Sequence, residues 1–217
     1  MVRSLRRQGR GGRCRASHLP TISSVTTILL ARHGESDWNS AGRWQGHADR
    51  PLTELGRRQA EQLAGELAGV PLVAAYASDL RRAWETAEIA LVARGLAVTR
   101  LWALREVDVG SWTGLSRTEI ADRFPAAFGR WRSGGDGWDD GEPYDTMAER
   151  VVEAVGRIAE THPGGHVLVV THGGPIRALK ARALGMPFAE HRRTALVEAN
   201  AALSRLAVRN GAIDLLE

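Results

Sequence analysis

Two histidines, each followed by glycine, are the residues best suited to chemistry in this 217-residue chain. His33 comes directly after Arg32, and His172 precedes Gly173 and Gly174. A neutral imidazole is a good nucleophile near pH 7, and an arginine offers a planar fork of donors for phosphate oxygens. The pairing of histidine with arginine therefore favours phosphoryl chemistry, although a single Arg-His-Gly sequence is weak evidence by itself.

Both histidines follow short apolar runs, which are typical of buried strands. Val25–Ala31 ends at Arg32, Val167–Val170 ends just before His172, and a third run, Leu72–Ala77, leads through Ser78 into Arg82. Functional groups in parallel sheets gather beyond the carboxyl ends of the strands. We therefore expect three distant segments of the chain to meet at one edge of a sheet.

Helical patterns alternate with these runs, and the middle of the chain is less regular. Helices are predicted over Thr53–Gly69, with Thr53 as a possible N-cap, over Leu80–Val92, over Ser116–Trp131 with an interruption near Pro125, over Asp145–Glu160 and over Ile176–Leu184. Further strands are predicted over Ala97–Leu101 and, around an Asn210-Gly211 turn, over Ala195–Leu216, with a loop over Ser133–Glu142. The alternation predicts an α/β fold: a three-layer α/β/α sandwich with a mainly parallel sheet.

Composition and charge narrow the class of protein. About 43% of the residues are hydrophobic and 25% are charged, which is ordinary for a globular domain. The single cysteine, Cys14, excludes an internal disulfide and a cysteine zinc site, which favours a cytoplasmic location. No run of about 18 apolar residues exists that could cross a membrane.

The basic character of the chain is concentrated at its start. Six arginines and no acidic residue lie within Met1–Ser24. The remaining 23 basic and 25 acidic residues give the rest of the chain a net charge of about −2. We expect residues 1–24 to be a disordered tail and residues 25–217 to form one domain. A tether for nucleic acid or another acidic surface is the alternative use of the tail, although nucleic acid is not the expected partner of the domain.

Further short motifs accompany the two histidine segments in a fixed order. They are Arg32-His33-Gly34-Glu35-Ser36, Asn39, Gln45-Gly46, Pro51–Gly56, Ser78–Ala83, Leu104-Arg105-Glu106, Gly110–Gly114 and Thr171–Gly174. Together they resemble the histidine phosphatase superfamily, also called the phosphoglycerate mutase-like superfamily, from Val25 to about Leu206. The resemblance implies the phosphoglycerate mutase-like fold.

The same resemblance implies a role for each catalytic residue. His33 matches the family's phosphorylated nucleophile. Arg32, Arg82 and His172 match the groups that hold the transferred phosphoryl group, with Arg82 rather than its neighbour Arg81 in register. Glu106, rather than the rival acid Asp108, matches the general acid that protonates the leaving alkoxide and later activates water. No metal or other cofactor is expected, because arginines and histidines would neutralise the phosphate charge.

The substrate-binding residues are expected on three further segments. Asn39 and the Gln45-Gly46 segment match family positions that line the site. The backbone N–H groups of Gly173 and Gly174 lie near the start of a predicted helix, which is a favourable place for an anion. Trp38 and Trp44 could be pocket walls or core residues, and the acids between Asp136 and Glu142 are expected to form a solvated loop.

These residues predict a phosphatase that hydrolyses a small phosphate monoester, such as a sugar phosphate or a phosphoglycerate derivative, through phosphohistidine. A cofactor-dependent mutase-type phosphotransferase stays an alternative because Arg130 and Arg132 could partly replace the carboxylate-binding arginines of mutases. A non-catalytic phosphate-binding relative is the other alternative, and a homodimer is possible. An acidic loop covering the pocket would disfavour polyanionic substrates such as bisphosphates.

Overall fold

The computed structural model describes residues 24–216. Nearly all of the predicted tail, residues 1–24, lies outside this part of the chain, so the predicted division into tail and domain stays a prediction. Within residues 24–216, none of the helices combines the length and the apolar character needed to cross a membrane.

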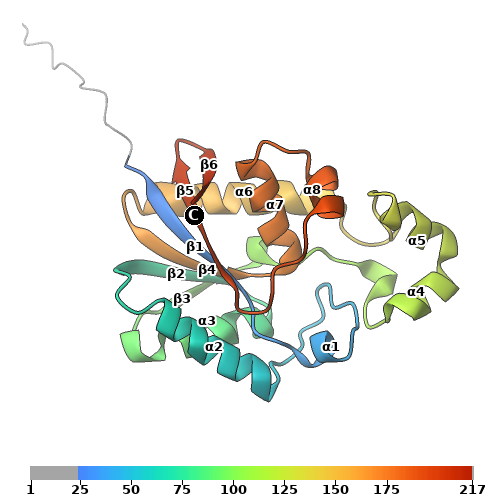
Figure 1. The fold of residues 1–217 in the computed structure, drawn as a ribbon, viewed down its shortest axis with the longest axis horizontal. Helices are drawn as coiled ribbons and strands as arrows, with labels where there is room; N and C mark the ends of the chain where they lie inside the picture. Colours follow the sequence, from blue (N-terminus) through green and yellow to red (C-terminus); the bar gives the residue numbers. More distant parts are fainter. Residues whose placement is uncertain (1–23, 217) are drawn as a thin grey trace, which may run out of the picture.

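A six-stranded sheet forms the centre of the fold (Figure 1). Its strands are β1 (Thr26–Arg32), β2 (Leu72–Ser78), β3 (Val98–Leu101), β4 (His166–Thr171), β5 (Leu203–Arg209) and β6 (Ala212–Leu216), in the order β3-β2-β4-β1-β5-β6. The first four strands of this order run parallel, and β5 is antiparallel to both β1 and β6. The prediction of a mainly parallel sheet between helical layers is therefore confirmed.

Helices lie on both faces of the sheet and at the end where the parallel strands finish (Figure 1). They are α1 (Asp37–Ser40), α2 (Glu54–Glu66), α3 (Arg81–Leu91), α4 (Arg117–Arg123), α5 (Pro125–Arg132), α6 (Tyr144–Thr161), α7 (Gly173–Ala183) and α8 (Phe188–Thr194). The α2–α3 pair covers one face, and α6 and α7 cover the other. The short helices α4 and α5 lie at one end of the molecule.

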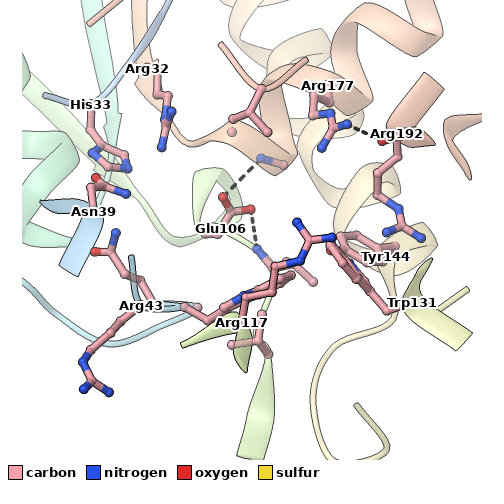
Figure 2. A pocket seen from close by; sticks show the side chains of 18 of the residues that line it. Arg32, His33, Asn39, Arg43, Glu106, Arg117, Trp131, Tyr144, Arg177 and Arg192 are labelled. Atoms are coloured by element: carbon pink, nitrogen blue, oxygen red, sulfur yellow. Dashed lines mark hydrogen bonds between the residues drawn. The ribbon is translucent and has the colours of Figure 1, made fainter. Parts of the chain in front are cut away.

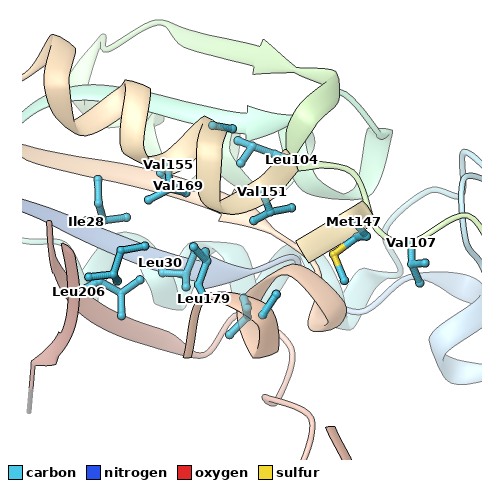
Figure 3. Close-up of a cluster of buried hydrophobic side chains, with 14 of the residues drawn as sticks. Ile28, Leu30, Leu104, Val107, Met147, Val151, Val155, Val169, Leu179 and Leu206 are labelled. Carbon is cyan, nitrogen blue, oxygen red and sulfur yellow. The ribbon is translucent and has the colours of Figure 1, made fainter. Parts of the chain in front are cut away.

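The two sides of the sheet bury alternate residues of each central strand. In β1, Ile28 and Leu30 pack toward α6 and α7 (Figure 3). Leu29 and Ala31 point to the other face and pack toward α2 and α3. This alternation follows from the pleat of a strand, and burial on both faces explains why the strand is apolar throughout. The sheet is thus a rigid platform whose carboxyl edge carries the polar segments.

Most of the predicted elements are present, although the short helix α1 was not predicted and three further differences are found. Helix α7 begins at Gly173 rather than Ile176, and β5 begins at Leu203 rather than near Ala195. Helix α8, preceded by Pro187, was not predicted because its sequence is short and largely polar. It is held by tertiary contacts, since His191 and Arg192 are both buried within it.

Candidate active site

Three neighbouring parallel strands bring the predicted catalytic segments together. Arg32 ends β1, Ser78 ends β2 and leads into Arg82 of α3, and His172 directly follows β4. Because β2, β4 and β1 are adjacent, these residues meet at one sheet edge, as predicted. A cavity of about 540 Å³ opens there (Figure 2), which is within the usual range for small-molecule sites.

His33 is held as a neutral imidazole with one nitrogen available. Its Nδ1 lies 2.6 Å from the carbonyl oxygen of Gly34. A carbonyl can only accept, so Nδ1 carries the proton and Nε2 keeps a free lone pair. Burial, together with the positive charges of Arg82 and Arg32, holds the pKa of His33 well below its ordinary value. The imidazole is therefore neutral at pH 7, with the proton on Nδ1 and the lone pair of Nε2 free, as nucleophilic attack requires.

His172 lies beside His33 and has no hydrogen-bond partner among the described residues. The two ring centroids are 5.1 Å apart, and the His172 side chain is fully buried. Neither of its ring nitrogens is bonded. Burial and the charge of Arg82 hold the pKa of His172 well below its ordinary value. A buried polar ring without a partner is costly, which is consistent with a bond that forms only when a ligand is present.

Two arginines place positive charge next to these imidazoles. The Arg82 side chain is 1% exposed and donates to the carbonyl oxygens of Ala48, at 2.8 Å, and Gly46, at 3.0 Å. Burial lowers the pKa of Arg82 to about 10, so the guanidinium stays charged at neutral pH. Arg32 donates to the carbonyl of Glu198. The Nε atoms of both arginines are buried and unbonded within residues 24–216.

The carboxylate of Glu106 lies against the start of α7. Its Oε2 accepts from the backbone N–H of Gly174 at 3.1 Å, and its Oε1 accepts from Val107 at 2.9 Å. A Cβ at position 174 would lie 2.2 Å from Oε1, so only glycine permits this approach. The rival acid Asp108 is turned away and accepts from the N–H of Gly110. Glu106 lines the pocket and Asp108 does not.

The N-terminus of α7 therefore already holds the carboxyl group of Glu106. Both Gly173 and Gly174 were expected to offer N–H groups to the ligand, and for Gly174 this was wrong, because its N–H donates to Glu106. Gly173 lines the pocket as expected. An anion at this end of the 11-residue helix is favoured by the helix dipole.

The segment that carries Glu106 is held in place by residues outside the cavity lining that were not predicted from the sequence. Arg150 of α6 donates to the carbonyl oxygens of Ala103, Arg105 and Glu106, and pairs with Glu142 at 2.6 Å. Glu142 was expected to be a solvated loop residue, which is wrong, since its side chain is only 12% exposed. A glutamate and an arginine eight residues apart match no spacing that would predict an ion pair, so this contact could not be predicted from the sequence.

The remaining predicted binding residues also lie in the wall of the cavity. Asn39, Gln45 and Gly46 all line the cavity. The hydroxyl oxygen of Ser36 lies 3.0 Å from the side-chain oxygen of Asn39 and 2.8 Å from that of Gln45, and its single proton can be donated to either of them. These contacts orient both amides so that their NH₂ groups remain available to a ligand. Gly46 has φ +47°, and a Cβ there would lie 2.8 Å from Val109.

Aromatic and basic candidates divide between the pocket and its surroundings. Trp44 lines the cavity, whereas Trp38 lies under the guanidinium of Arg50, 4.7 Å from its ring centroid. Arg132 lines the cavity, whereas Arg130 pairs with Asp139 outside it. Only one member of each predicted pair is therefore placed to contact a ligand.

The expected acidic cover over the pocket is absent from the lining of the cavity. Asp136 caps the N–H of Tyr144, and Asp140 accepts from Ser111. Glu106 is the one acidic residue among the lining side chains, which include eight arginines: Arg32, Arg43, Arg82, Arg117, Arg132, Arg177, Arg192 and Arg193. The expectation that acidic side chains repel polyanions from this pocket is therefore wrong. Arg177 and Arg192 were missed because each resembles a solvated helix charge in sequence.

A buried neutral histidine surrounded by cations in a small cavity is an arrangement suited to phosphoryl transfer. Within residues 24–216, no three histidine, cysteine or acidic side chains gather in a way that could hold a metal ion. Arg32 and Arg82 place positive charge beside the imidazoles, where it can balance the charge of a phosphate group.

Comparison with known proteins places the chain in a family. Residues 28–217 match the histidine phosphatase superfamily (branch 1). The chain is 41% identical over 165 residues to a metal-independent phosphoserine phosphatase of Arabidopsis thaliana, covering 74% of this chain and 69% of that protein. It is 36% identical over 172 residues to a glucosyl-3-phosphoglycerate phosphatase of Mycobacterium tuberculosis, covering 75% and 77%.

The fold agrees with this assignment. The solved structure of Bacillus stearothermophilus YhfR is similar, with a TM-score of 0.82 at 34% identity, over 88% of this chain and 95% of that one. The chain belongs to the histidine phosphatase superfamily, branch 1, and has the phosphoglycerate mutase-like fold. Within that family it is a phosphoric monoester hydrolase, as the sequence predicted.

Proposed function

We propose that His33 takes the phosphoryl group of a small organic phosphate monoester and passes it to water. The observation that carries this proposal is the bond from His33 Nδ1 to Gly34, which leaves Nε2 as the free nucleophilic nitrogen. Nε2 attacks phosphorus while the bond to the ester oxygen breaks. Charge on the phosphoryl oxygens is stabilised by Arg32, Arg82 and His172, whose unbonded nitrogens become satisfied.

Glu106 serves both halves of the reaction. In its protonated form it gives a proton to the departing alkoxide, so that the alcohol leaves neutral. The resulting carboxylate then takes a proton from the water that attacks phosphohistidine, and inorganic phosphate leaves. Contact with the Gly174 N–H keeps the carboxyl group at the pocket wall between these steps.

The proposed substrates are sugar phosphates and phosphoglycerate-like esters. Relatives named as phosphatases of phosphoserine and of glucosyl-3-phosphoglycerate support this choice. The cavity accommodates a molecule of that size. Asn39 and Gln45 supply amide donors, and the aromatic rings of Trp44, Trp131 and Tyr144 supply flat surfaces for a sugar or a short carbon chain.

The experiment that tests the nucleophile is trapping of the covalent intermediate. The purified enzyme is mixed with substrate, quenched with base within milliseconds, and digested for mass spectrometry. Acid-labile phosphate is expected on His33. His33→Ala should lose the label and the activity, whereas His166→Ala, at the opposite end of β4, should retain both. A label on another residue would overturn the proposal.

The mutase alternative is separated by the products. With 3-phosphoglycerate as the substrate, a phosphatase releases inorganic phosphate, and a mutase forms the 2-phosphate isomer. We expect phosphate to account for nearly all of the substrate consumed. Dominant isomer formation would instead mean that phosphohistidine is returned to a second hydroxyl.

A further inference from the structure

The active-site cavity contains far more positive charge than one phosphate group requires. Only one of its eight lining arginines, Arg43, forms an ion pair within residues 24–216, and its partner is Glu119. Arg32 and Arg82 lie next to the histidines and are assigned to the phosphoryl group. The other lining arginines lie farther out and need a separate explanation, because unpaired like charges repel one another.

Two of these arginines are fixed rather than mobile. Arg177 of α7 donates to the backbone carbonyl oxygens of Arg192 and Ala195, the latter at 2.6 Å. Arg192 of α8 is 9% exposed, donates to the carbonyl of Gly135 at 2.9 Å, and stacks with its Cζ 4.0 Å from the Tyr144 ring centroid. Each contact uses one terminal nitrogen, Nη2, so each guanidinium retains other donors, including a buried, unbonded Nε.

The position of this pair relative to Glu106 indicates which part of the substrate the two guanidinium groups face. Figure 2 shows Glu106 between Arg32 and His33 on one side and Arg177 and Arg192 on the other. Glu106 protonates the leaving oxygen, so the alcohol portion of the substrate extends beyond Glu106, away from His33. The two fixed guanidinium groups therefore face the leaving group rather than the phosphoryl group.

We propose that Arg177 and Arg192 bind a carboxylate on the leaving alcohol, so that the preferred substrates are phosphate monoesters of hydroxy acids. A guanidinium can pair bidentately with a carboxylate, and such charge-assisted bonds are roughly twice as strong as hydrogen bonds between neutral groups. The inference rests on the proposed function, because it uses Glu106 to locate the leaving oxygen.

The same charges act against an ammonium group on the substrate. Glu106 is the only acidic side chain in the lining, and both of its oxygens are engaged by backbone N–H groups. A substrate ammonium would thus lie among arginines without a carboxylate partner, which costs free energy in a partly buried site. The hydroxy acid ester should therefore be preferred over the corresponding amino acid ester.

The first test compares matched substrates on the wild-type enzyme, which avoids any folding defect. The values of kcat/KM are measured by phosphate release for 3-phosphoglycerate, glycerol 3-phosphate and O-phosphoserine. Glycerol 3-phosphate differs from 3-phosphoglycerate only at the carboxylate. We expect 3-phosphoglycerate to exceed it by roughly 10- to 100-fold, the equivalent of one charge-assisted contact. O-phosphoserine should fall below 3-phosphoglycerate.

The second test assigns that preference to Arg177. Arg177→Gln should lower kcat/KM for 3-phosphoglycerate more than for glycerol 3-phosphate, mainly through KM. The matched control is Arg182→Gln on the same helix, which removes the same charge from an exposed position outside the pocket and should leave the ratio unchanged. The melting temperature of each variant shows whether α8 is still in place.

Several outcomes would overturn the inference and leave the proposed function intact. Equal turnover of 3-phosphoglycerate and glycerol 3-phosphate would mean that no carboxylate is bound. Faster turnover of fructose 1,6-bisphosphate than of 3-phosphoglycerate would assign the arginines to a second phosphate instead. A failure of the proposed function itself would be recognised by a different result: p-nitrophenyl phosphate would then also leave no phosphate label on His33.

Discussion

Glu142 and Arg150 form a nearly buried ion pair that fixes the backbone of Glu106. Two bonds of 2.6 and 2.7 Å join the side chains, which are 12% and 10% exposed, and Arg150 donates to the Glu106 carbonyl at 2.9 Å. The pair lies outside the lining of the cavity, and we assign to it the positioning of the acid rather than contact with substrate.

Glu142→Gln should therefore lower both stability and activity. Loss of the carboxylate charge leaves Arg150 buried without its counter-charge, and breaking a buried pair typically costs about 3–5 kcal/mol. Urea denaturation measures the free energy of unfolding. The rate of hydrolysis of alkyl phosphates shows whether Glu106 has been displaced. The control is Glu153→Gln on α6, the helix of Arg150; the pair of Glu153 with Arg157 is exposed, and its loss should cost less than about 1 kcal/mol. Equal losses of stability in the two variants would mean that burial of the Glu142–Arg150 pair does not contribute to stability.

Glu106→Gln should slow the enzyme according to its leaving group. Hydrolysis of an alkyl phosphate needs a proton at the departing oxygen, so we expect a loss of roughly 100- to 10,000-fold. Hydrolysis of p-nitrophenyl phosphate needs little protonation and should fall much less in its first step. Burst kinetics separate phosphorylation from hydrolysis of phosphohistidine. Asp108→Asn tests the rival acid, and an equally selective loss there would refute the assignment of Glu106.

Gly174→Ala should impair catalysis without unfolding the protein. The added methyl group would lie 2.2 Å from Oε1 of Glu106, so the carboxyl group must move away from its position. We expect kcat to fall by at least about tenfold for alkyl esters, since small misplacements of a catalytic group have large effects. Gly156→Ala in α6 meets nothing within 4 Å and should be neutral or stabilising in thermal unfolding. An unaltered kcat in Gly174→Ala would show that the site tolerates the displaced acid.

Stability should decline as the pH falls below about 6.5. The folded state holds the pKa of His33 and His172 well below that of the unfolded chain, so the unfolded state binds protons first. Below the unfolded pKa each histidine destabilises the fold by on the order of 1 kcal/mol per pH unit, until its folded pKa is reached. Denaturation curves at pH 8, 6.5 and 5 measure the effect. His172→Gln should show a weaker pH dependence than the wild type, and an identical slope would mean that His172 does not cause the loss of stability.

The residues proposed for catalysis could be predicted because they follow directly after the ends of parallel strands. Arg32, His33 and His172 come directly after apolar runs, and the sequence alone indicates that such ends meet at one sheet edge. Arg82 needed the register of the family motif, because Arg81 beside it is of the same type. In the structure Arg81 faces solvent and Arg82 is buried.

The outer part of the pocket could not be predicted for a physical reason. Arg177 and Arg192 are held by backbone carbonyls and by an aromatic ring far away in the sequence, and these contacts leave no pattern of spacing. The one feature of the sequence that could have indicated a pocket residue was Arg177, because it lies in the mostly apolar segment that follows His172. The acidic loop was misjudged for the same reason, since its carboxylates bind local backbone and arginine groups instead of facing the cavity.

The backbone of His33, the proposed nucleophile, is held by a segment that lies 167 residues further along the chain. The carbonyl oxygen of His33 accepts from the side chain of Asn200 at 3.0 Å and from the N–H of Ala201 at 3.2 Å, just before β5 pairs with β1. A nascent polypeptide that has already made both catalytic histidines would still lack these contacts. The backbone of His33 is therefore fixed completely only after this returning segment has docked beside β1, so the geometry of the proposed nucleophile depends on folding of the whole sheet.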